Sequence, residues 1–343
     1  MVKLTGRQET LLGLIIRDYI DTAQPVSSKG LVDKYNLGIS SATVRNEMSA
    51  LTEAGLLRQP HTSAGRVPTE EGYRYFVQRL VGDSDLPMAE QRTISHQFYQ
   101  ARTDADQWMR LAASVLARHA RGAALVTAPH PEKTRFKQLE LIATQGRLVL
   151  MVLVLEGGEV RQQMLTLAEP VAQEILRESA QRITQACQGM DAGAMAAQAG
   201  RFPTLEQEIT RLLAEMMHRT DAVSSGEIYR DGLTNVLAEP EFADSEAARH
   251  ALRVLEERSF LEEFLSKSLS PNVGGVQVLI GGEGDWEELK DCSMVLARYG
   301  AAGFATGAVG VLGPIRMAYG RTISAVRYVS GLMTDLVIDM YSG

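Results

Sequence analysis

One stretch near the N-terminus decides how the first part of this chain folds. From Ser40 to Thr69 it reads SSATVRNEMSALTEAGLLRQPHTSAGRVPT. Serines such as Ser40 and Ser41 cap helix N-termini, and a glycine such as Gly55 commonly ends a helix. The stretch therefore predicts a helix that ends near Ala54 and is followed by a non-helical segment.

The predicted helix has an apolar face and a polar face. At 100° per residue, Met48 and Leu51 fall within about 40° of Val44 and form a stripe that would be buried. The opposite face is free of carboxylates at its centre and carries Ala42, Thr43, Arg45, Asn46 and Ser49. Asparagine pairs with adenine edges, arginine with guanine or phosphate, and alanine or a threonine methyl with the thymine methyl. This composition is suited to contacts with DNA bases, but a solvated face of a three-helix bundle would explain it equally well.

The second half of the stretch predicts a β-hairpin. Two short extended runs, Leu56–Pro60 and Arg66–Thr69, enclose a turn of small, hydrogen-bonding residues. The tip of the hairpin carries no acid, and its polar residues are His61, Thr62, Ser63 and Arg66. Such a tip can approach a phosphate backbone or enter a minor groove. The hairpin therefore adds weight to the DNA-binding interpretation of the helix.

The segments on either side complete a known arrangement. Thr5–Ala23 has the apolar spacing of an amphipathic helix, which Pro25 ends. Ser27 or Ser28 can cap a short second helix, and Glu70–Val81 predicts a fourth. Three short helices, a hairpin and a further helix are typical of a winged helix-turn-helix, so we predict DNA binding for this region.

Charge and composition narrow the classes of protein to which the whole chain can belong. Of 343 residues, 35 are basic and 42 acidic, giving a net charge of −7; residues 1–82 hold 10 basic and 8 acidic residues, leaving 25 and 34 elsewhere. Only the first segment is thus suited to an anionic polymer. The longest aliphatic run, Leu148–Leu155, is too short for a membrane span, and no secretory signal is apparent. Cys187 and Cys292 form no disulfide framework, which favours a cytoplasmic protein without a membrane partner.

The remainder of the chain alternates between strand and helix patterns. Helical spacing covers Gln91–Arg121, strand patterns follow, a long helical region comes next, and strand patterns then return before a closing helix. Strands, helices and strands again indicate an insertion into an α+β domain. The expected strands are 124–127, 136–143, 147–155, 160–167, 276–280, 294–298 and 303–312, and the later helices are 171–217, 245–265 and 323–340.

No motif indicates catalysis, a cofactor or a metal. The chain lacks HExxH, GxSxG and GxxxxGK[ST] patterns, and its six histidines are scattered. Gly281–Gly284 resembles a phosphate loop, but acidic neighbours favour a structural turn. Glycines 303, 307, 310 and 313 are typical of close strand packing, and the two cysteines of small buried apolar residues. Glu239–Phe242 is either a loop anchored by its aromatic residue or a surface for a partner.

Several stretches together resemble one known family, the heat-inducible transcription repressor HrcA. Ser40–Met48, Gly55–Leu57, Pro60–Thr69 and Gly72–Tyr75 carry the resemblance in the N-terminal region. Three distant stretches agree with it: Asn235–Phe242, Ile280–Glu283 and Gly310–Tyr319. Because the matching motifs are long and lie near both ends, the resemblance is specific.

The resemblance implies an α+β multidomain fold. A winged-helix DNA-binding domain (1–82) and a helical linker (83–121) would precede a discontinuous GAF-like domain (122–168 and 272–343). A largely helical dimerisation domain (169–271) would be inserted into it. It also implies a cytoplasmic, non-enzymatic repressor, associated with the nucleoid when bound to DNA. Its partners would be an inverted-repeat operator on double-stranded DNA, upstream of chaperone operons, a second copy of the chain, and a GroEL-type chaperonin that promotes DNA binding.

This interpretation assigns roles to individual residues. Ala42, Thr43, Arg45 and Asn46 would face the major groove, and Ser40 and Ser41 would contact phosphate at the helix N-terminus. The backbone or minor groove would be held by Lys29, His61, Thr62, Ser63 and Arg66.

Two alternatives stay open. The chain could be a winged-helix regulator that senses a small effector in its GAF-like domain. It could also be an enzyme with a DNA-binding appendage, which the missing catalytic motifs disfavour.

Overall fold

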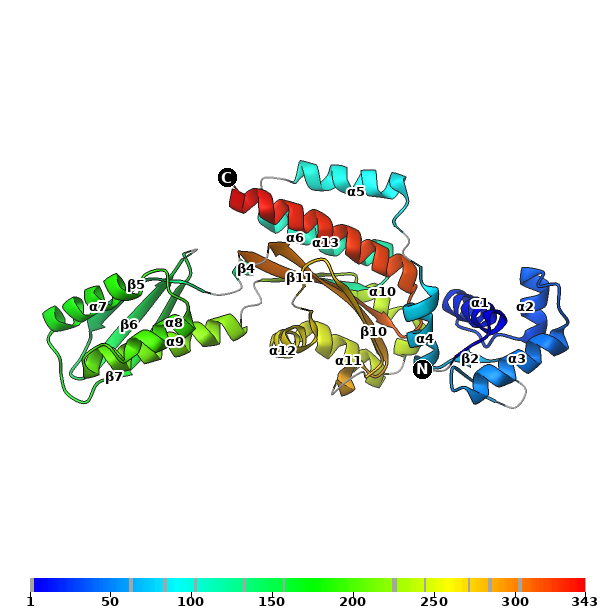
Figure 1. Cartoon of the computed structure of the whole chain (residues 1–343), viewed down its shortest axis with the longest axis horizontal. Helices are drawn as coiled ribbons and strands as arrows, with labels where there is room; N and C mark the ends of the chain where they lie inside the picture. Colours follow the sequence, from blue (N-terminus) through cyan, green and yellow to red (C-terminus); the bar gives the residue numbers. More distant parts are fainter. Residues whose placement is uncertain are drawn as a thin grey trace. The chain divides into compact units, whose positions relative to one another are not determined.

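Two compact units make up the computed structural model of the chain (Figure 1). It describes residues 3–61, 64–82, 85–101, 104–131, 134–156, 158–223, 227–243, 245–270, 272–282, 286–301 and 304–342. The first, the main unit, comprises Met1–Pro129, Ser225–Ala301 and Thr306–Gly343. The second, the inserted unit, comprises His130–Ser224 and Ala302–Ala305. Helices and strands are mixed throughout, which confirms the predicted α+β class.

The main unit begins with helices and a small sheet, at the blue end of the chain in Figure 1. The elements are α1 (Gly6–Thr22), α2 (Ser28–Tyr35), α3 (Ser41–Glu53), β1 (Leu57–Arg58), β2 (Val67–Pro68), α4 (Glu70–Tyr75) and the π-helical η1 (Phe76–Leu80). All four predicted helices are confirmed, although the second half of the fourth is π-helical. Thr5 begins α1 with a capping box, in which its side chain and that of Gln8 bond to each other's backbone N–H.

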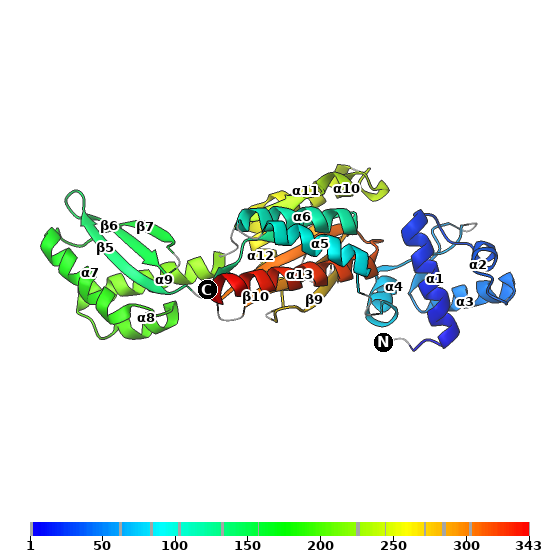
Figure 2. The same cartoon turned by 90° about the horizontal axis from the view of Figure 1, so that it is seen from above.

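A sheet forms the centre of the main unit, with helices on both faces (Figures 1 and 2). Its strands run in the order β8 (Ile228–Asp231), β3 (Ala123–Thr127), β11 (Ala305–Pro314), β10 (Cys292–Ala301) and β9 (Val276–Ile280). One face carries α6 (Ala105–Ala120) and α13 (Tyr319–Ser342), and the other α11 (Ser245–Glu256) and α12 (Arg258–Ser268). A sixth strand of this sheet, β4 (His130–Pro131), pairs with β11. The further elements are α5 (Met88–Gln100), α10 (Leu233–Leu237), η2 (Pro240–Ala243) and η3 (Glu287–Leu289).

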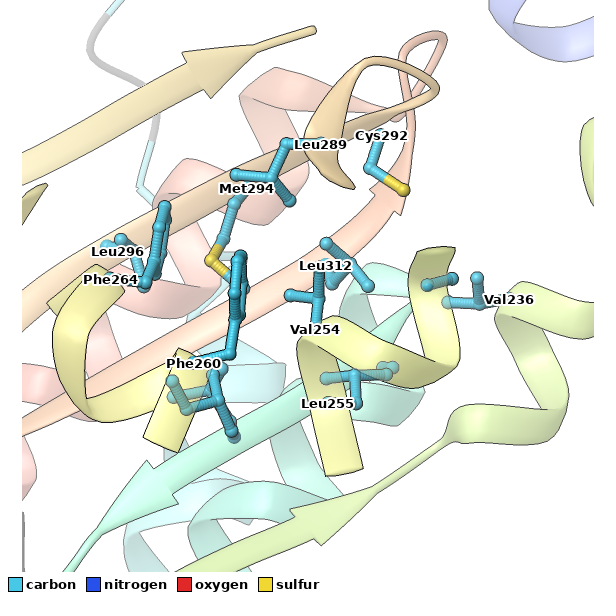
Figure 3. Close-up of a cluster of buried hydrophobic side chains, with 14 of the residues drawn as sticks. Val236, Val254, Leu255, Phe260, Phe264, Leu289, Cys292, Met294, Leu296 and Leu312 are labelled. Carbon is cyan, nitrogen blue, oxygen red and sulfur yellow. The ribbon is translucent and has the colours of Figure 1, made fainter. Parts of the chain in front are cut away.

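Alternation along β10 explains why helices cover both faces of this sheet. Met294 and Leu296 point into a core with Phe264 of α12, as Figure 3 shows. On the opposite face, the Ser293 hydroxyl lies 2.8 Å from the hydroxyl of Tyr319 at the start of α13. In the neighbouring strand a Cβ at Gly310 would lie 2.5 Å from Cδ2 of Leu296. Gly310 thus leaves room for the Leu296 side chain of the neighbouring strand, which agrees with the predicted close strand packing.

The inserted unit is a three-stranded antiparallel sheet covered by helices. Its strands are β5 (Phe136–Ala143), β6 (Leu148–Leu155) and β7 (Val160–Thr166), and its helices α7 (Gln173–Cys187), α8 (Ala192–Ala199) and α9 (Thr204–Val223). Alternate residues of the strands, among them Leu141, Met151 and Leu153, are buried with Leu176 and Ile183 of α7. The sheet thus has its own core.

The predicted boundaries of the insertion differ from this arrangement. Strands 136–166 were expected in the GAF-like domain and residues 169–271 in the insertion. Instead, β5, β6 and β7 pair with one another and are covered by the helices that follow, while residues 228–268 pack on the central sheet. The expected linker also differs, because α6 is part of the main core: Trp108, Met109 and Leu116 are buried. Within the described residues, no helix is long and apolar enough to cross a membrane.

Candidate nucleic-acid interface

Helix α3 exposes the face that the sequence singles out. Ser40 is its N-cap: the side chain accepts a hydrogen bond from the backbone N–H of Thr43 at 3.1 Å. Val44, Met48 and Leu51 are buried, with exposed fractions of at most 3%. Because these three positions fix the rotation of the helix, Ala42, Arg45 and Asn46 are exposed to solvent.

Helix α1 supports α3 from behind. The two helices pack against each other, and Leu12, Ile15 and Ile16 of α1 are fully buried. Glu47 of α3 forms an ion pair with Arg7 of α1, with 3.5 Å between Oε1 and Nη1. The acid nearest the exposed face is therefore engaged by a neighbouring helix, although an exposed pair of this kind contributes little stability.

The hairpin is pinned to the segment between α1 and α2. Strands β1 and β2 pair Leu57 with Pro68 and Arg58 with Val67. On the other side, Val26 and Arg66 exchange backbone hydrogen bonds of 2.9 and 2.8 Å. A Cβ at Gly65 would lie 2.3 Å from the carbonyl oxygen of Val26, so only glycine fits this close approach.

The structure places the predicted residues in three local groups. Ser40, Ser41, Ala42, Arg45 and Asn46 are exposed on the first two turns of α3 or at its cap, and Thr43 is half-buried. The Thr43 hydroxyl lies 2.9 Å from that of Ser40, so the two share a hydrogen bond. Lys29 is exposed in the first turn of α2 and His61 beside the hairpin, whereas Thr62 and Ser63 lie outside the described residues.

Arg66 has a partner that the sequence does not reveal. Its Nε donates a hydrogen bond to the Thr52 hydroxyl at 3.0 Å, and its side chain is half-buried. The remaining guanidinium donors are on Nη1 and Nη2, so Arg66 joins the hairpin to the end of α3 while retaining groups suited to a phosphate. Arg58, exposed in β1, is a further cation that our sequence reasoning missed. The signal for it was strand alternation: because the apolar Leu57 is buried, the next residue, Arg58, has to face solvent.

The two cysteines and the glycine-rich loop have environments that fit structural roles. No group of three or more His, Cys, Asp or Glu side chains among them is placed to hold a metal ion. Burial raises the pKa of both thiols, to about 12 for Cys292, which suits unreactive core residues. Of the loop Gly281–Gly284, only the first two residues lie within the described part of the chain, and a Cβ at Gly281 would meet the Glu70 carboxylate at 2.6 Å. A carboxylate at this position is unsuited to a phosphate site.

Comparison with known proteins gives consistent results. Residues 106–323 match the family described as the HrcA protein C-terminal domain. The heat-inducible transcription repressor HrcA of Roseiflexus castenholzii is 44% identical, with 98% of this chain and 96% of that protein covered. The protein of the same name from Herpetosiphon aurantiacus is 46% identical, with 99% and 97% covered. A crystal structure of a hypothetical protein shares the fold, with a TM-score of 0.59 at 22% identity over 98% of this chain and 99% of that one.

These similarities span nearly the whole chain, including the N-terminal helices and hairpin. The class of protein they define is that of transcription repressors. The chain belongs to the HrcA family of heat-inducible transcription repressors.

Proposed function

We propose that this chain represses heat-shock chaperone and chaperonin operons by binding an inverted-repeat operator as a homodimer. Residues 1–82 would act as a winged helix-turn-helix, with α3 in the major groove and the hairpin against the backbone or minor groove. The observation that carries this proposal is the exposed face of α3, where Ala42, Arg45 and Asn46 lie opposite a fully buried stripe. Arginine and asparagine are residue types that hydrogen-bond to base edges, and alanine can contact the thymine methyl.

We assign dimerisation to the inserted unit. The sheet face opposite its helices carries exposed apolar side chains beside the polar Glu140 and Gln162: Ile142, Val160 and Met164 are 44%, 57% and 52% exposed. Ile142 and Met164 flank Leu150 of the central strand on this face. An apolar patch of this kind on a soluble protein marks an interaction surface, and two copies of one sheet face can bury each other. Ile142→Asp with Met164→Asp is expected to shift the sedimentation coefficient to that of a monomer; an unchanged dimer would refute the assignment.

The test of the proposal is equilibrium binding to two labelled duplexes at stated salt. One carries the inverted repeat upstream of the chaperonin operon, and the other has the repeat scrambled at equal composition. A preference of about a thousandfold or more supports the proposal, because specific regulators discriminate at least this well. Equal, weak binding to both would refute it. Adding the GroEL-type chaperonin tests the regulatory link: stronger operator binding supports it and unchanged binding contradicts it.

Asn46→Ala tests direct base reading. We expect a loss of about 1–3 kcal/mol on the operator with little change on the scrambled duplex, as for a single base contact. Ser49→Ala is the matched control, because the Ser49 hydroxyl donates to the backbone carbonyl of Arg45 at 3.1 Å and is already engaged. An equal loss on both duplexes would contradict the role of Asn46.

Arg66→Ala tests the backbone contact. We expect weaker binding to both duplexes and a smaller salt dependence, because one phosphate contact is lost. Thr52→Val removes the partner of Arg66 but keeps its charge. If Thr52→Val reduced the salt dependence equally, the contribution of Arg66 would be structural.

The alternative that the chain senses a small effector remains a prediction. Thermal stabilisation of the protein by an added ligand would reveal such an effector.

A further inference from the structure

Arg316 joins three segments of the main unit that are distant in sequence. It lies between β11 and α13, and its side chain is only 12% exposed. Its guanidinium donates to both carboxylate oxygens of Glu241, with 3.2 Å from Nη2 to Oε2, and also to Glu239. Nη1 donates to the backbone carbonyl of Ile20, in the last turn of α1, at 3.1 Å.

The bond to Ile20 caps α1 at its C-terminus. The last hydrogen bond of the helix runs from the Ala23 N–H to the Tyr19 carbonyl, so Ile20 belongs to the final turn, whose carbonyls lack intrahelical donors. The last turn of α1 contains no basic residue of its own. A cation here satisfies a carbonyl and complements the negative end of the helix dipole. The C-terminal part of the chain therefore supplies the cap of an N-terminal helix.

The segment Glu239–Phe242 holds Arg316 in place. Phe242 is 4% exposed and packs in the core beside the central sheet, so the aromatic residue anchors this segment, which forms a short 3-10 helix and not the loop that was expected. Glu241 lies in the short η2 helix and Glu239 directly precedes it, and Nη2 of Arg316 donates to both carboxylates. Charge-assisted bonds with two oxygens of one carboxylate fix the plane of an arginine, which a single lysine contact cannot do.

Fixing α1 also fixes α3, because the two helices pack together and are joined by the pair Arg7–Glu47. We propose that Arg316 is a positioning residue for DNA recognition. By capping α1 from the core, it sets the orientation in which α3 is presented, and hence the spacing of half-sites that the dimer accepts. This inference rests on the proposed operator binding.

Half-site spacing gives a readout that stability alone would not move. Full-length wild type and Arg316→Gln are titrated with operators in which the centre of the repeat is unchanged or lengthened by half a helical turn. Wild type is expected to discriminate strongly between them, and Arg316→Gln about tenfold less, a typical size for coupling between sites. Binding to random duplex and its salt dependence should not change. The control is Arg298→Gln, since the Arg298 side chain donates to the backbone carbonyl of Ser270 and to the hydroxyl of the buried Thr306, neither of which belongs to residues 1–82.

A distance measurement tests the positioning role of Arg316 without DNA. Spin labels at Asp33→Cys in α2 and Ser114→Cys in α6 lie at exposed positions, and the two natural cysteines are buried. The distance distribution is expected to broaden in Arg316→Gln and to stay narrow in Arg298→Gln. Unchanged spacing discrimination together with an unchanged distribution would overturn the role of Arg316. If wild type showed no operator preference, the repressor proposal would fail instead. The distance distribution between the two spin labels would then be the test of whether Arg316 positions the N-terminal helices.

Discussion

Gly65 provides a sharp test of how the hairpin is held. An added Cβ would lie 2.3 Å from the carbonyl oxygen of Val26 and 2.5 Å from its carbonyl carbon, both backbone atoms that no rotamer change can move. Gly65→Ala must therefore separate the hairpin from the segment before α2. It would strain or break the two hydrogen bonds between Val26 and Arg66, which measure 2.9 and 2.8 Å.

The expected cost follows from these contacts. Two hydrogen bonds at about 0.5–1.5 kcal/mol each and an overlap of about 1–3 kcal/mol oppose the substitution. Restricting the unfolded chain returns only about 0.4–1 kcal/mol. We therefore expect the N-terminal helices and hairpin to lose about 1–6 kcal/mol of stability.

The assay has to report on this region directly. Trp108 and Trp286 both lie outside residues 1–82, so tryptophan fluorescence would follow the wrong part of the chain. Hydrogen exchange of residues 24–28 and 64–68 is the suitable measurement, and Gly65→Ala should accelerate it. Gly6→Ala is the matched control, because its Cβ would meet no atom within 4 Å. Equal protection in Gly65→Ala and wild type would refute the reasoning.

Three further predictions concern the two cores. Arg182→Met is expected to lower the urea midpoint of the inserted unit, because Arg182 Nε donates at 2.8 Å to the buried Glu206 carboxylate, which would lose this partner; an unchanged midpoint would contradict this. Burial lowers the pKa of His119 below 6.5, so the unfolded state binds the proton more readily and the unfolding free energy should fall as the pH drops below about 6.5. His119→Gln should reduce this pH dependence, which denaturation measured at a series of pH values would show. Because burial raises the pKa of Cys187, and that of Cys292 to about 12, native protein should resist alkylation near pH 8 and react in urea; mass spectrometry showing modified native protein would count against this.

The N-terminal elements were predictable because their signals are local. Ser40 caps α3 and Thr5 caps α1 within one turn of the residues they serve. The buried stripe of α3 follows from helical periodicity alone. In contrast, the bond between Arg66 and Thr52 joins residues on different elements, and no spacing rule reveals it.

The expected boundaries of the insertion differ from those of the two compact units for a related reason. Apolar alternation identified residues 136–143 and 148–155 as strands, but alternation does not say which strand pairs with which. The edge of the central sheet is instead β8, a strand of four residues (Ile228–Asp231). It pairs with β3, from which it is separated by about a hundred residues of chain. So short a segment has no periodic signal, and its pairing depends on long-range packing. The same holds for Arg316, whose partners lie about 75 and 296 residues away.

Charge and geometry together explain why such a distant arginine matters for the proposed function. Residues 1–82 carry only two more basic than acidic side chains, so their sequence-independent attraction to phosphates is small. A dimer compensates through the effective concentration of its second reading helix, but only if both helices meet their half-sites at once. The groups that orient α3 then contribute to operator affinity as directly as those that touch bases. Loosening the cap on Ile20 should therefore weaken operator binding even though Arg45 and Asn46 are intact.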